Sequence, residues 1–249
     1  MRLHAVGLCG LDDGVDVQAL FNDAEPWPDF VEWGVLIRDD KAGAPRCPRM
    51  ATVETLLRAN DGRYKFAAHF CSRAAADLLA GDAALVVRLQ ALGVGRVQIN
   101  ATKANNFDSS TLGAAHVKNL LAVMRAVPEV EFIVQRNDET RPLWQPLEAM
   151  HGGPPANVSM LFDASAGRGV AITSFPLPKH RSTRAGYAGG LGPRNVAAVL
   201  EELAREVPPD VPATWVDMES GLRDGDDGFS IAKARAVCAA VEAFQRSCA

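Results

Sequence analysis

The chain has 249 residues, of which 48% are hydrophobic and 22% are charged. This excludes a mini-protein, because a chain of this size buries a sizeable core and still keeps a charged surface. Lysine and arginine number 26 against 30 acidic residues, so the formal net charge is -4. A chain without excess positive charge has no general field that attracts phosphate backbones or anionic lipid, which argues against nucleic acid and membranes as partners.

The cysteines indicate the redox environment. The five cysteines are scattered without a CxxC pair and are Cys9, Cys47, Cys71, Cys238 and Cys248. An odd and unpaired set fits free thiols in a reducing compartment better than a disulfide framework. No run of about 18 apolar residues is present that would suit a membrane span or an export signal. We therefore expect a cytoplasmic protein.

Short runs rich in Val, Ile, Leu and Phe recur along the chain, and stretches with helical apolar spacing separate most of them. This alternation predicts repeated β-α units. The predicted strands cover residues 3–8, 30–37, 64–70, 96–101, 131–135, 158–162, 184–188 and 214–218. Eight strands close a (β/α)8 TIM barrel, and no linker or shift in composition divides the chain. We expect an α/β fold with one domain over residues 1–249.

Helices are predicted between several of these strands. One has Pro193 in its first turn and ends before Pro208 and Pro209. Similar apolar stripes cover residues 73–92, 109–127 and 230–244. Residues 165–183 have no such stripe and are rich in glycine and proline, so they predict a long loop on the active side after the sixth strand.

Polar residues follow or end many of the predicted strands. In chain order they are Cys9, Glu32, His69, Gln98, Asn100, Gln135, Asp163, Gly189, Gly190, Glu219, Ser220 and Gly221. In barrel enzymes the carboxyl ends of the strands meet at the mouth that carries the chemistry. Because an unpaired buried charge costs several kcal/mol, a ring of this kind predicts a ligand site.

Structural roles remain open for several members of this ring. Cys9 also suits an inert core position, His69 a hydrogen-bonded core histidine, and the two glutamines suit bonds to neighbouring backbone. Glu32 and Asp163 interrupt apolar runs at predicted strand ends, which favours membership of a site.

Two glycine-containing turns predict a phosphate site. Gly189 and Gly190 join the seventh strand to a helix, where bare backbone amides and a positive helix end favour an anion. Ser220 and Gly221 follow the eighth strand. Phosphate sites in TIM barrels are often built from these two loops together, although each turn alone also suits a simple tight bend.

In strand order these motifs resemble phosphoribosylanthranilate isomerase, the barrel enzyme of tryptophan biosynthesis. Leu8-Cys9-Gly10-Leu11 resembles the opening motif of that family, and Val97-Gln98-Ile99-Asn100 resembles its Val-Gln-Leu-His. Leu161-Phe162-Asp163 with Gly167 and Gly169 resembles the Leu-Leu-Asp and glycine-rich loop. The matches after the seventh and eighth strands are Ala188-Gly189-Gly190-Leu191 and Val216-Asp217 followed by Ser220-Gly221.

The resemblance implies roles for individual residues. Cys9 corresponds to the general base and Asp163 to the general acid. Arg46 corresponds to the arginine that holds the substrate carboxylate. The resemblance implies contacts of Gly167 and Gly169 with the substrate and its phosphate, and phosphate binding by Gly189, Gly190, Ser220 and Gly221. The remaining polar residues of the mouth are predicted to contact the substrate: Glu32, His69, Gln98, Asn100, Gln135 and Glu219.

The chain departs from the family at two informative positions. Gly7 stands where the family has a lysine two residues before the cysteine, so a cation beside the thiol is lost. Glu219 replaces a serine of the phosphate loop. Glu32 adds a negative charge that raises the pKa of the thiol and, next to Asp163, favours one protonated carboxyl group.

Three functions follow. The first is an Amadori-type aldose-to-ketose isomerisation of a phosphorylated aminosugar. The second is another isomerase, epimerase or lyase that acts on a different phosphorylated small molecule. The third is a non-catalytic binder of phosphate ligands. We expect no cofactor and no metal, since a metal set of Glu32, His69 and Asp163 has no recognised spacing. A homodimer remains open.

Overall fold

The computed structural model describes residues 3–21, 24–163, 166–208, 211 and 214–248. Eight parallel strands form a closed barrel in the order β1-β2-β3-β4-β5-β6-β7-β8. The strands are β1 (Leu3–Cys9), β2 (Val31–Ile37), β3 (Lys65–Phe70), β4 (Arg96–Ile99), β5 (Glu131–Arg136), β6 (Val158–Phe162), β7 (Arg184–Ala188) and β8 (Thr214–Met218). The predicted TIM barrel is confirmed, and every predicted strand is present with ends within two residues of those expected.

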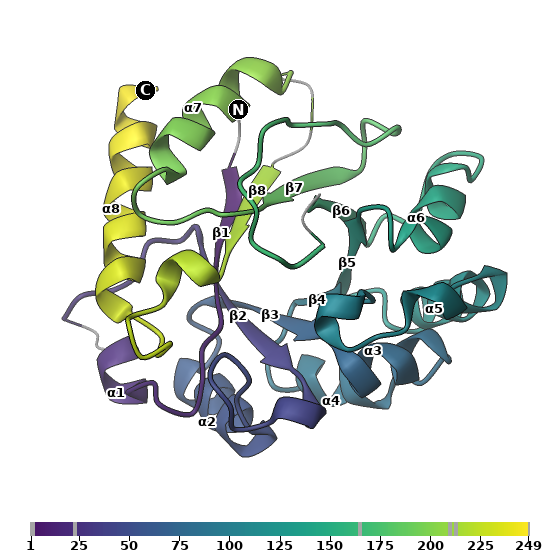
Figure 1. The fold of residues 1–249 in the computed structure, drawn as a ribbon, viewed down its shortest axis with the longest axis horizontal. Helices are drawn as coiled ribbons and strands as arrows, with labels where there is room; N and C mark the ends of the chain where they lie inside the picture. The colour runs from purple at the N-terminus through teal and green to yellow at the C-terminus, as the bar shows by residue number, and fades with distance from the viewer. Residues whose placement is uncertain (1–2, 22–23, 164–165, 209–210, 212–213, 249) are drawn as a thin grey trace.

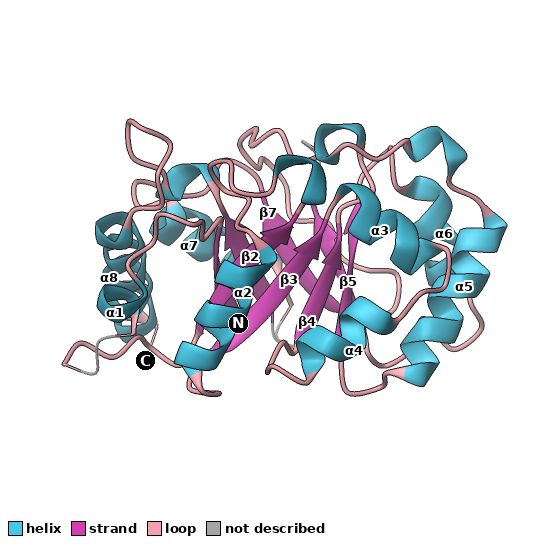
Figure 2. Cartoon of the chain, turned by 90° about the horizontal axis from the view of Figure 1, so that it is seen from below, coloured by secondary structure: helices cyan, strands magenta, loops and turns pink. Residues whose placement is uncertain are grey.

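Helices surround the sheet (Figures 1 and 2). They are α1 (Val17–Leu20), α2 (Met50–Asn60), α3 (Ser72–Leu79), α4 (Ala84–Gln90), α5 (Ala114–Ala126), α6 (Arg141–Glu148), α7 (Val196–Glu206) and α8 (Ile231–Ser247). Short 3-10 turns are η1 (Asp39–Lys41), η2 (Lys103–Asn105), η3 (Ser109–Thr111) and η4 (Ser220–Leu222). In the part of the chain that the structure describes, no helix has both the length and the apolar character to span a bilayer.

Three predicted helices differ from the structure. The stretch 73–92 is two helices, because Gly81 has a left-handed φ of 100° and Asp82 accepts a hydrogen bond from the amide of Ala84 at the start of α4. The stretch 109–127 divides into η3 and α5. Helix α7 begins at Val196 rather than at Pro193, since Asn195 bonds the backbone of the preceding turn.

Two other predictions partly concern residues outside the described part of the chain. Pro209, one of the two prolines predicted to end α7, and Ser165, the first residue of the predicted loop, both lie there. The described remainder of the loop, residues 166–183, contains neither helix nor strand. The predicted free thiols are confirmed, because none of the five cysteines forms a disulfide.

Most apolar side chains pack between the sheet and its helices. A separate small cluster fills the middle of the barrel and comprises Ala5, Ile133, Leu161 and Trp215. The indole of Trp215 occupies space that only a glycine leaves free, since a Cβ at Gly186 would lie 2.0 Å from its ring. The centre of the barrel is thus solid, and ligands are restricted to its ends.

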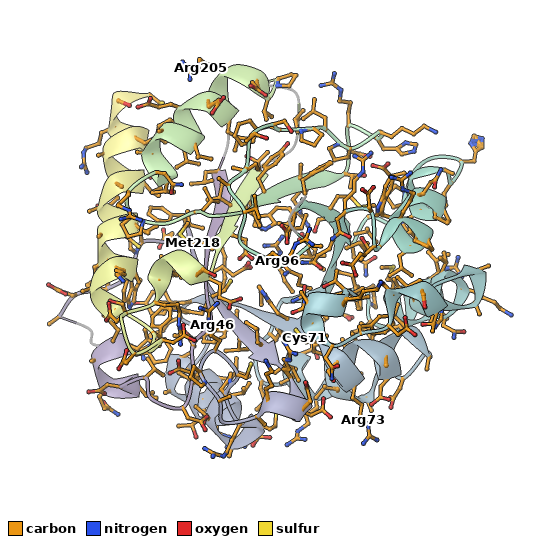
Figure 3. The ribbon with its side chains drawn as sticks, viewed as in Figure 1. Arg46, Cys71, Arg73, Arg96, Arg205 and Met218 are labelled. Carbon is orange, nitrogen blue, oxygen red and sulfur yellow. The ribbon has the colours of Figure 1, made fainter. Side chains whose placement is uncertain are left out.

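A buried ion cluster lies near the start of the strands. Arg96, near the centre of the molecule in Figure 3, donates to Glu32 at 2.7 Å and to Glu131 at 3.0 Å. Its guanidinium also lies 4.2 Å from the ring centre of Trp215. Arg184 pairs with the other oxygen of Glu131. These residues close the barrel opposite the carboxyl ends of its strands.

We predict that Arg96→Met strongly destabilises the protein. The substitution leaves the buried carboxylate of Glu32 without its guanidinium partner, and breaking a buried ion pair in this way costs about 3–5 kcal/mol. Urea unfolding followed by circular dichroism measures the loss. The matched control is Arg73→Met, which removes an exposed pair with Asp77 and is expected to change stability by less than about 1 kcal/mol. Equal effects of the two substitutions would contradict the prediction.

Candidate functional site

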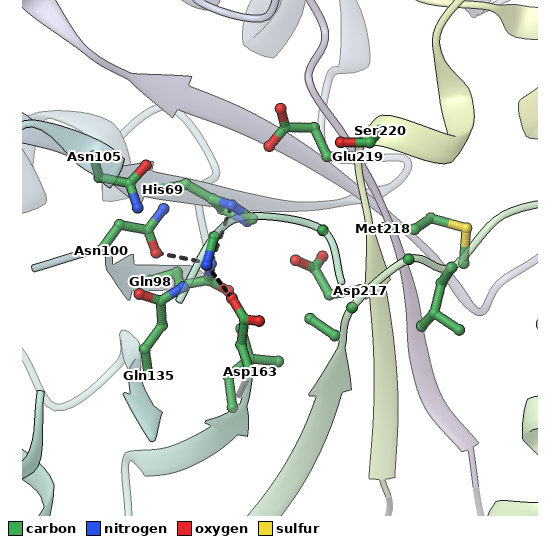
Figure 4. A pocket seen from close by; sticks show the side chains of 17 residues that line it. His69, Gln98, Asn100, Asn105, Gln135, Asp163, Asp217, Met218, Glu219 and Ser220 are labelled. Carbon is green, nitrogen blue, oxygen red and sulfur yellow. Dashed lines mark hydrogen bonds between the residues drawn. The ribbon is translucent and has the colours of Figure 1, made fainter. Parts of the chain in front are cut away.

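A pocket lies at the carboxyl ends of the strands (Figure 4). Its lining comes from the strands and loops of the second half of the chain together with β3 and β4. The lining residues are His69, Gln98, Asn100, Asn105, Gln135, Leu161, Asp163, Gly167, Gly169, Ala188, Gly189, Gly190, Leu191, Asp217, Met218, Glu219 and Ser220. Most residues predicted to belong to a site therefore share one pocket.

Cys9 lies next to this pocket and is almost fully buried. Its Sγ donates a hydrogen bond to Oδ1 of Asp217 at 2.8 Å and lies 3.7 Å from Nε2 of His69. Two glycines make room for the contact, because a Cβ at Gly7 would lie 2.1 Å from Oδ1 of Asp217 and one at Gly34 would lie 2.3 Å from the sulfur. A thiol, an imidazole and a carboxylate thus meet where β1, β3 and β8 end.

The environment of these groups shifts their pKa values. Burial, followed by the charge of Asp217, raises the pKa of Cys9 well above its usual range. Burial raises the pKa of Asp217 to about 7, although its hydrogen bond from Cys9 opposes the shift. Burial lowers the pKa of His69 to about 3, so its imidazole is neutral. Near neutral pH the thiol of Cys9 therefore keeps its proton, whereas Asp217 gains or loses one.

Asp163 follows β6 directly and is buried at the same mouth. Its Oδ2 accepts a hydrogen bond from the amide of Gly167 at 2.7 Å, so the glycine loop after β6 orients the carboxyl group. Asp163 and Asp217 both line the pocket. The geometry places two carboxyl groups around one space, as acid-base chemistry requires.

Three buried amide side chains line the pocket. Gln98 donates to Oδ1 of Asn100 at 2.9 Å and approaches Nδ1 of His69 at 3.3 Å. The Oε1 atoms of Gln98 and Gln135 are buried without a hydrogen-bond partner. Because buried polar atoms are normally paired, these acceptors point to a ligand or solvent with a donor group.

The turns after β7 and β8 lie side by side. A Cβ at Gly221 would lie 2.2 Å from the carbonyl oxygen of Leu191, and one at Gly192 would lie 3.1 Å from Cα of Gly221. Gly189, Gly190 and Ser220 line the pocket described above, whereas Gly221 lines a neighbouring hollow. That hollow also contains Arg194, Arg223 and Lys233. The two predicted glycine turns therefore meet, with cations beside them.

Arg46 lies at the rim, and acidic side chains already surround its guanidinium. It donates to Asp227 at 2.7 Å, to Glu219 at 3.1 Å and to the hydroxyl of Ser220 at 3.2 Å. Glu219 thus points its charge at Arg46. The structure places Arg46 in a groove beside the pocket rather than in its wall.

The prediction that Glu32 lies at the carboxyl end of its strand is wrong. Glu32 is the second residue of β2 and pairs with Arg96 at the opposite end of the barrel. It does not line the pocket, and its partner is Arg96 rather than Asp163. Burial raises the pKa of Glu32, and its charge contributes less to the pKa of Cys9 than that of Asp217. The metal set of Glu32, His69 and Asp163 is not brought together.

Sequence reasoning missed the position of Asp217 in the site. A usable signal was present, because Asp217 is a charged residue near the carboxyl end of the apolar strand over 214–218. Asp217 pairs with Gly7 across β1 and β8. The carboxylate of Asp217 fills the space where a side chain at position 7 would begin.

Comparisons with solved structures agree with this fold. TrpF from Jonesia denitrificans matches with a TM-score of 0.60 and 18% identity over 97% of this chain and 98% of that one. A phosphoribosylanthranilate isomerase in complex with reduced 1-(o-carboxyphenylamino)-1-deoxyribulose 5-phosphate matches with a TM-score of 0.56 and 13% identity over 97% and 100%. No protein-family model and no curated protein matches the sequence. The resemblance to phosphoribosylanthranilate isomerase is confirmed as a likeness of fold.

The same architecture occurs in a barrel with a different name. The catalytic domain of a family GH18 chitinase from a fern matches with a TM-score of 0.54 and 12% identity over 96% of this chain and 99% of that one. Fold similarity at this level does not select a reaction. The chemistry has to be argued from the side chains of the pocket.

We predict that the free energy of unfolding falls as the pH rises from 5 to 8, because of Asp217. Its folded pKa of about 7 exceeds the unfolded value of 3.8, so the folded state holds the proton more tightly and loses this advantage as pH rises. The loss attributable to this group is about 2–3 kcal/mol. Urea unfolding of the wild type and Asp217→Asn at both pH values isolates the contribution. An unchanged difference in stability between the two proteins at pH 5 and pH 8 would refute the assignment.

Proposed function

We propose that this protein is an acid-base isomerase that converts a phosphorylated aminoaldose into the corresponding aminoketose, as phosphoribosylanthranilate isomerase does. The observation that carries the proposal is the meeting of Asp163 with the Cys9–Asp217 pair at one pocket. An Amadori rearrangement needs a proton donor at the ring oxygen and a base at C2 of the sugar. The pocket offers one candidate for each role on different strands.

The proposed reaction begins with two proton transfers and ends with a tautomerisation that moves a proton from the C2 hydroxyl to C1. Asp163 donates a proton to the ring oxygen, the bond between that oxygen and C1 breaks, and a protonated imine forms. The base then removes the proton from C2, and its electron pair forms the enolamine. Tautomerisation of the enolamine to the ketone completes an isomerisation in which no atom is gained or lost.

Cys9 and Asp217 act together as the base in this proposal. The 2.8 Å contact allows the thiol proton to pass to Asp217, which leaves a thiolate to accept the C2 proton. Asp217 is suited to this exchange because its pKa of about 7 lies near neutral pH. The carboxylate therefore serves as a proton acceptor for the thiol, whereas a cation at position 7 would stabilise the thiolate directly.

The phosphate group of the substrate is assigned to the joined turns after β7 and β8. Gly189 and Gly190 have positive φ values of 133° and 60°, and a Cβ at either would meet the backbone of the loop at Val170 or Ala171. Arg194 and Lys233 lie around the adjoining hollow. Backbone amides together with nearby cations are a common way to hold phosphate in this fold.

We predict that Asp163→Asn and Cys9→Ala each lower kcat/KM for phosphoribosylanthranilate by roughly 10² to 10⁴, the usual contribution of one acid or base. Steady-state assays of substrate consumption measure the effect. Cys238→Ala is the matched control, because it removes a buried thiol from α8 and should leave the rate unchanged. Full activity of Cys9→Ala would exclude the proposed base.

A second candidate retains the reaction class and changes the substrate. The acidic partners of Arg46 favour a phosphorylated sugar whose amino substituent carries no carboxylate, since Asp227 and Glu219 already occupy the guanidinium. In the family pattern this arginine binds the carboxylate of the substrate. Its double pairing here removes the reason to prefer an anionic substituent.

We predict that the enzyme does not discriminate between phosphoribosylanthranilate and the aniline analogue that lacks the carboxylate. Their KM values should agree within about threefold, whereas one charge-assisted hydrogen bond to a free Arg46 would separate them by tenfold or more. Asp227→Asn releases part of the guanidinium and should lower KM for the carboxylate-bearing substrate alone. A strong preference of the wild type for that substrate would contradict the second candidate.

A further inference from the structure

The contact between Cys9, His69 and Asp217 has the composition of a transition-metal site. Among the described residues, these three form the one group of His, Cys, Asp or Glu side chains whose ligand atoms all lie within 4.8 Å of one another. Thiolate, imidazole and carboxylate together select Zn²⁺ and similar ions over Mg²⁺ or Ca²⁺, which prefer oxygen. We propose that Cys9, His69 and Asp217 bind a divalent ion of the Zn²⁺ class.

The distances suit a tetrahedral ion after a small movement. Ligand atoms around Zn²⁺ lie about 2.0–2.3 Å from the metal, so neighbouring ligands are roughly 3.3–3.7 Å apart. The sulfur of Cys9 is already 3.7 Å from Nε2 of His69. Its 2.8 Å hydrogen bond to Asp217 has to open by under about 1 Å when the ion replaces the proton between them.

Gln98 provides the outer support that a histidine ligand needs. The second ring nitrogen of a metal-binding imidazole donates its N–H to a neighbouring acceptor, and this hydrogen bond fixes the orientation of the ring. The amide of Gln98 lies 3.3 Å from Nδ1 of His69, and its Oε1 is buried without a partner. When the amides of Gln98 and Asn100 are both turned by 180°, Oε1 of Gln98 accepts hydrogen bonds from Nδ1 of His69 and from the amide of Asn100. The unprotonated Nε2 of His69 is then left to bind the ion. Amide orientation is an assignment, so both arrangements satisfy the same atom positions.

The pocket supplies the space for a fourth ligand, because His69 and Asp217 belong to its lining and Cys9 contacts both. An ion held by three protein ligands with one open position has the form of a catalytic rather than a structural zinc site. The charges also balance, because Cys9 thiolate and Asp217 carboxylate neutralise the two positive charges.

Binding of the ion releases the thiol proton of Cys9 and blocks Cys9 as the base of the proposed isomerisation. The ion displaces the thiol proton of Cys9 to solvent, and the sulfur lone pair forms the bond to the metal. This proposal goes beyond the isomerase function, and the two uses of Cys9 exclude each other. Stoichiometric Zn²⁺ should therefore inhibit the isomerisation, and a chelator should restore it.

Cobalt titration of the purified protein tests the site directly. We expect one Co²⁺ per chain, a sulfur-to-cobalt charge-transfer band and competition by Zn²⁺. Calorimetry in two buffers with different ionisation enthalpies should report about one proton released per ion. Folded wild-type protein that binds no cobalt, or binds it without the sulfur band, would overturn the proposal.

Variants identify the ligands and separate this site from the isomerase. Cys9→Ala and His69→Gln should each weaken binding by more than the roughly 10- to 100-fold expected for an outer partner such as Gln98→Leu. Cys248→Ala should retain the band, since this exposed cysteine lies outside the site. Asp163→Asn should bind cobalt normally even where it abolishes turnover, so failure of one proposal leaves the other standing. Unchanged binding by folded Cys9→Ala would exclude the site.

Discussion

Closure of the barrel between β1 and β8 is the constraint on which the site depends. Cys9 and Asp217 are 208 positions apart in the sequence, and they meet only because the first and last strands pair in parallel. Gly7 lies beside Asp217 in this pairing, and Gly34 lies beside Cys9 between β1 and β2. At both positions a Cβ would collide with the reactive atoms. Two missing side chains thus place a thiol and a carboxylate in contact.

The barrel separates its charges along its axis. Arg96 binds Glu32 and Glu131 near the start of the strands, Trp215 and its apolar neighbours fill the middle, and carboxyl and amide groups collect at the carboxyl ends. Side chains that alternate along each strand create this order, because every second residue faces the interior. The apolar layer places the lower ion cluster and the pocket at opposite ends. Stability and chemistry are therefore carried by different residues of the same strands.

The sequence was sufficient to predict the eight strands because each is a short apolar run between polar turns. It was also sufficient for most of the pocket, since residues at the ends of parallel strands must converge. Glu32 was misplaced because a charge within an apolar run resembles a site residue, although the strand predicted over 30–37 already puts it near the amino end. Asp217 was missed because its contact with Cys9 requires the pairing of β1 with β8, although its charge near the end of the strand over 214–218 was a local signal. The division of 73–92 into α3 and α4 depended on one glycine with a left-handed φ.

The charge of the pocket restricts what it can bind. Asp163, Asp217 and Glu219 line it, and among the described residues no lysine or arginine belongs to that lining. In the proposed function, the phosphate of the substrate therefore binds at the turns after β7 and β8, near Arg194 and Lys233, and its less charged end faces the carboxyl groups. Burial is the main cause of the raised pKa of Asp217, and the charges of Glu32 and Glu219 add to it; negative charge of this kind also favours a cation at Cys9 and His69. The negative charge of the pocket would stabilise the protonated imine of the proposed isomerisation. It would equally stabilise a bound divalent ion.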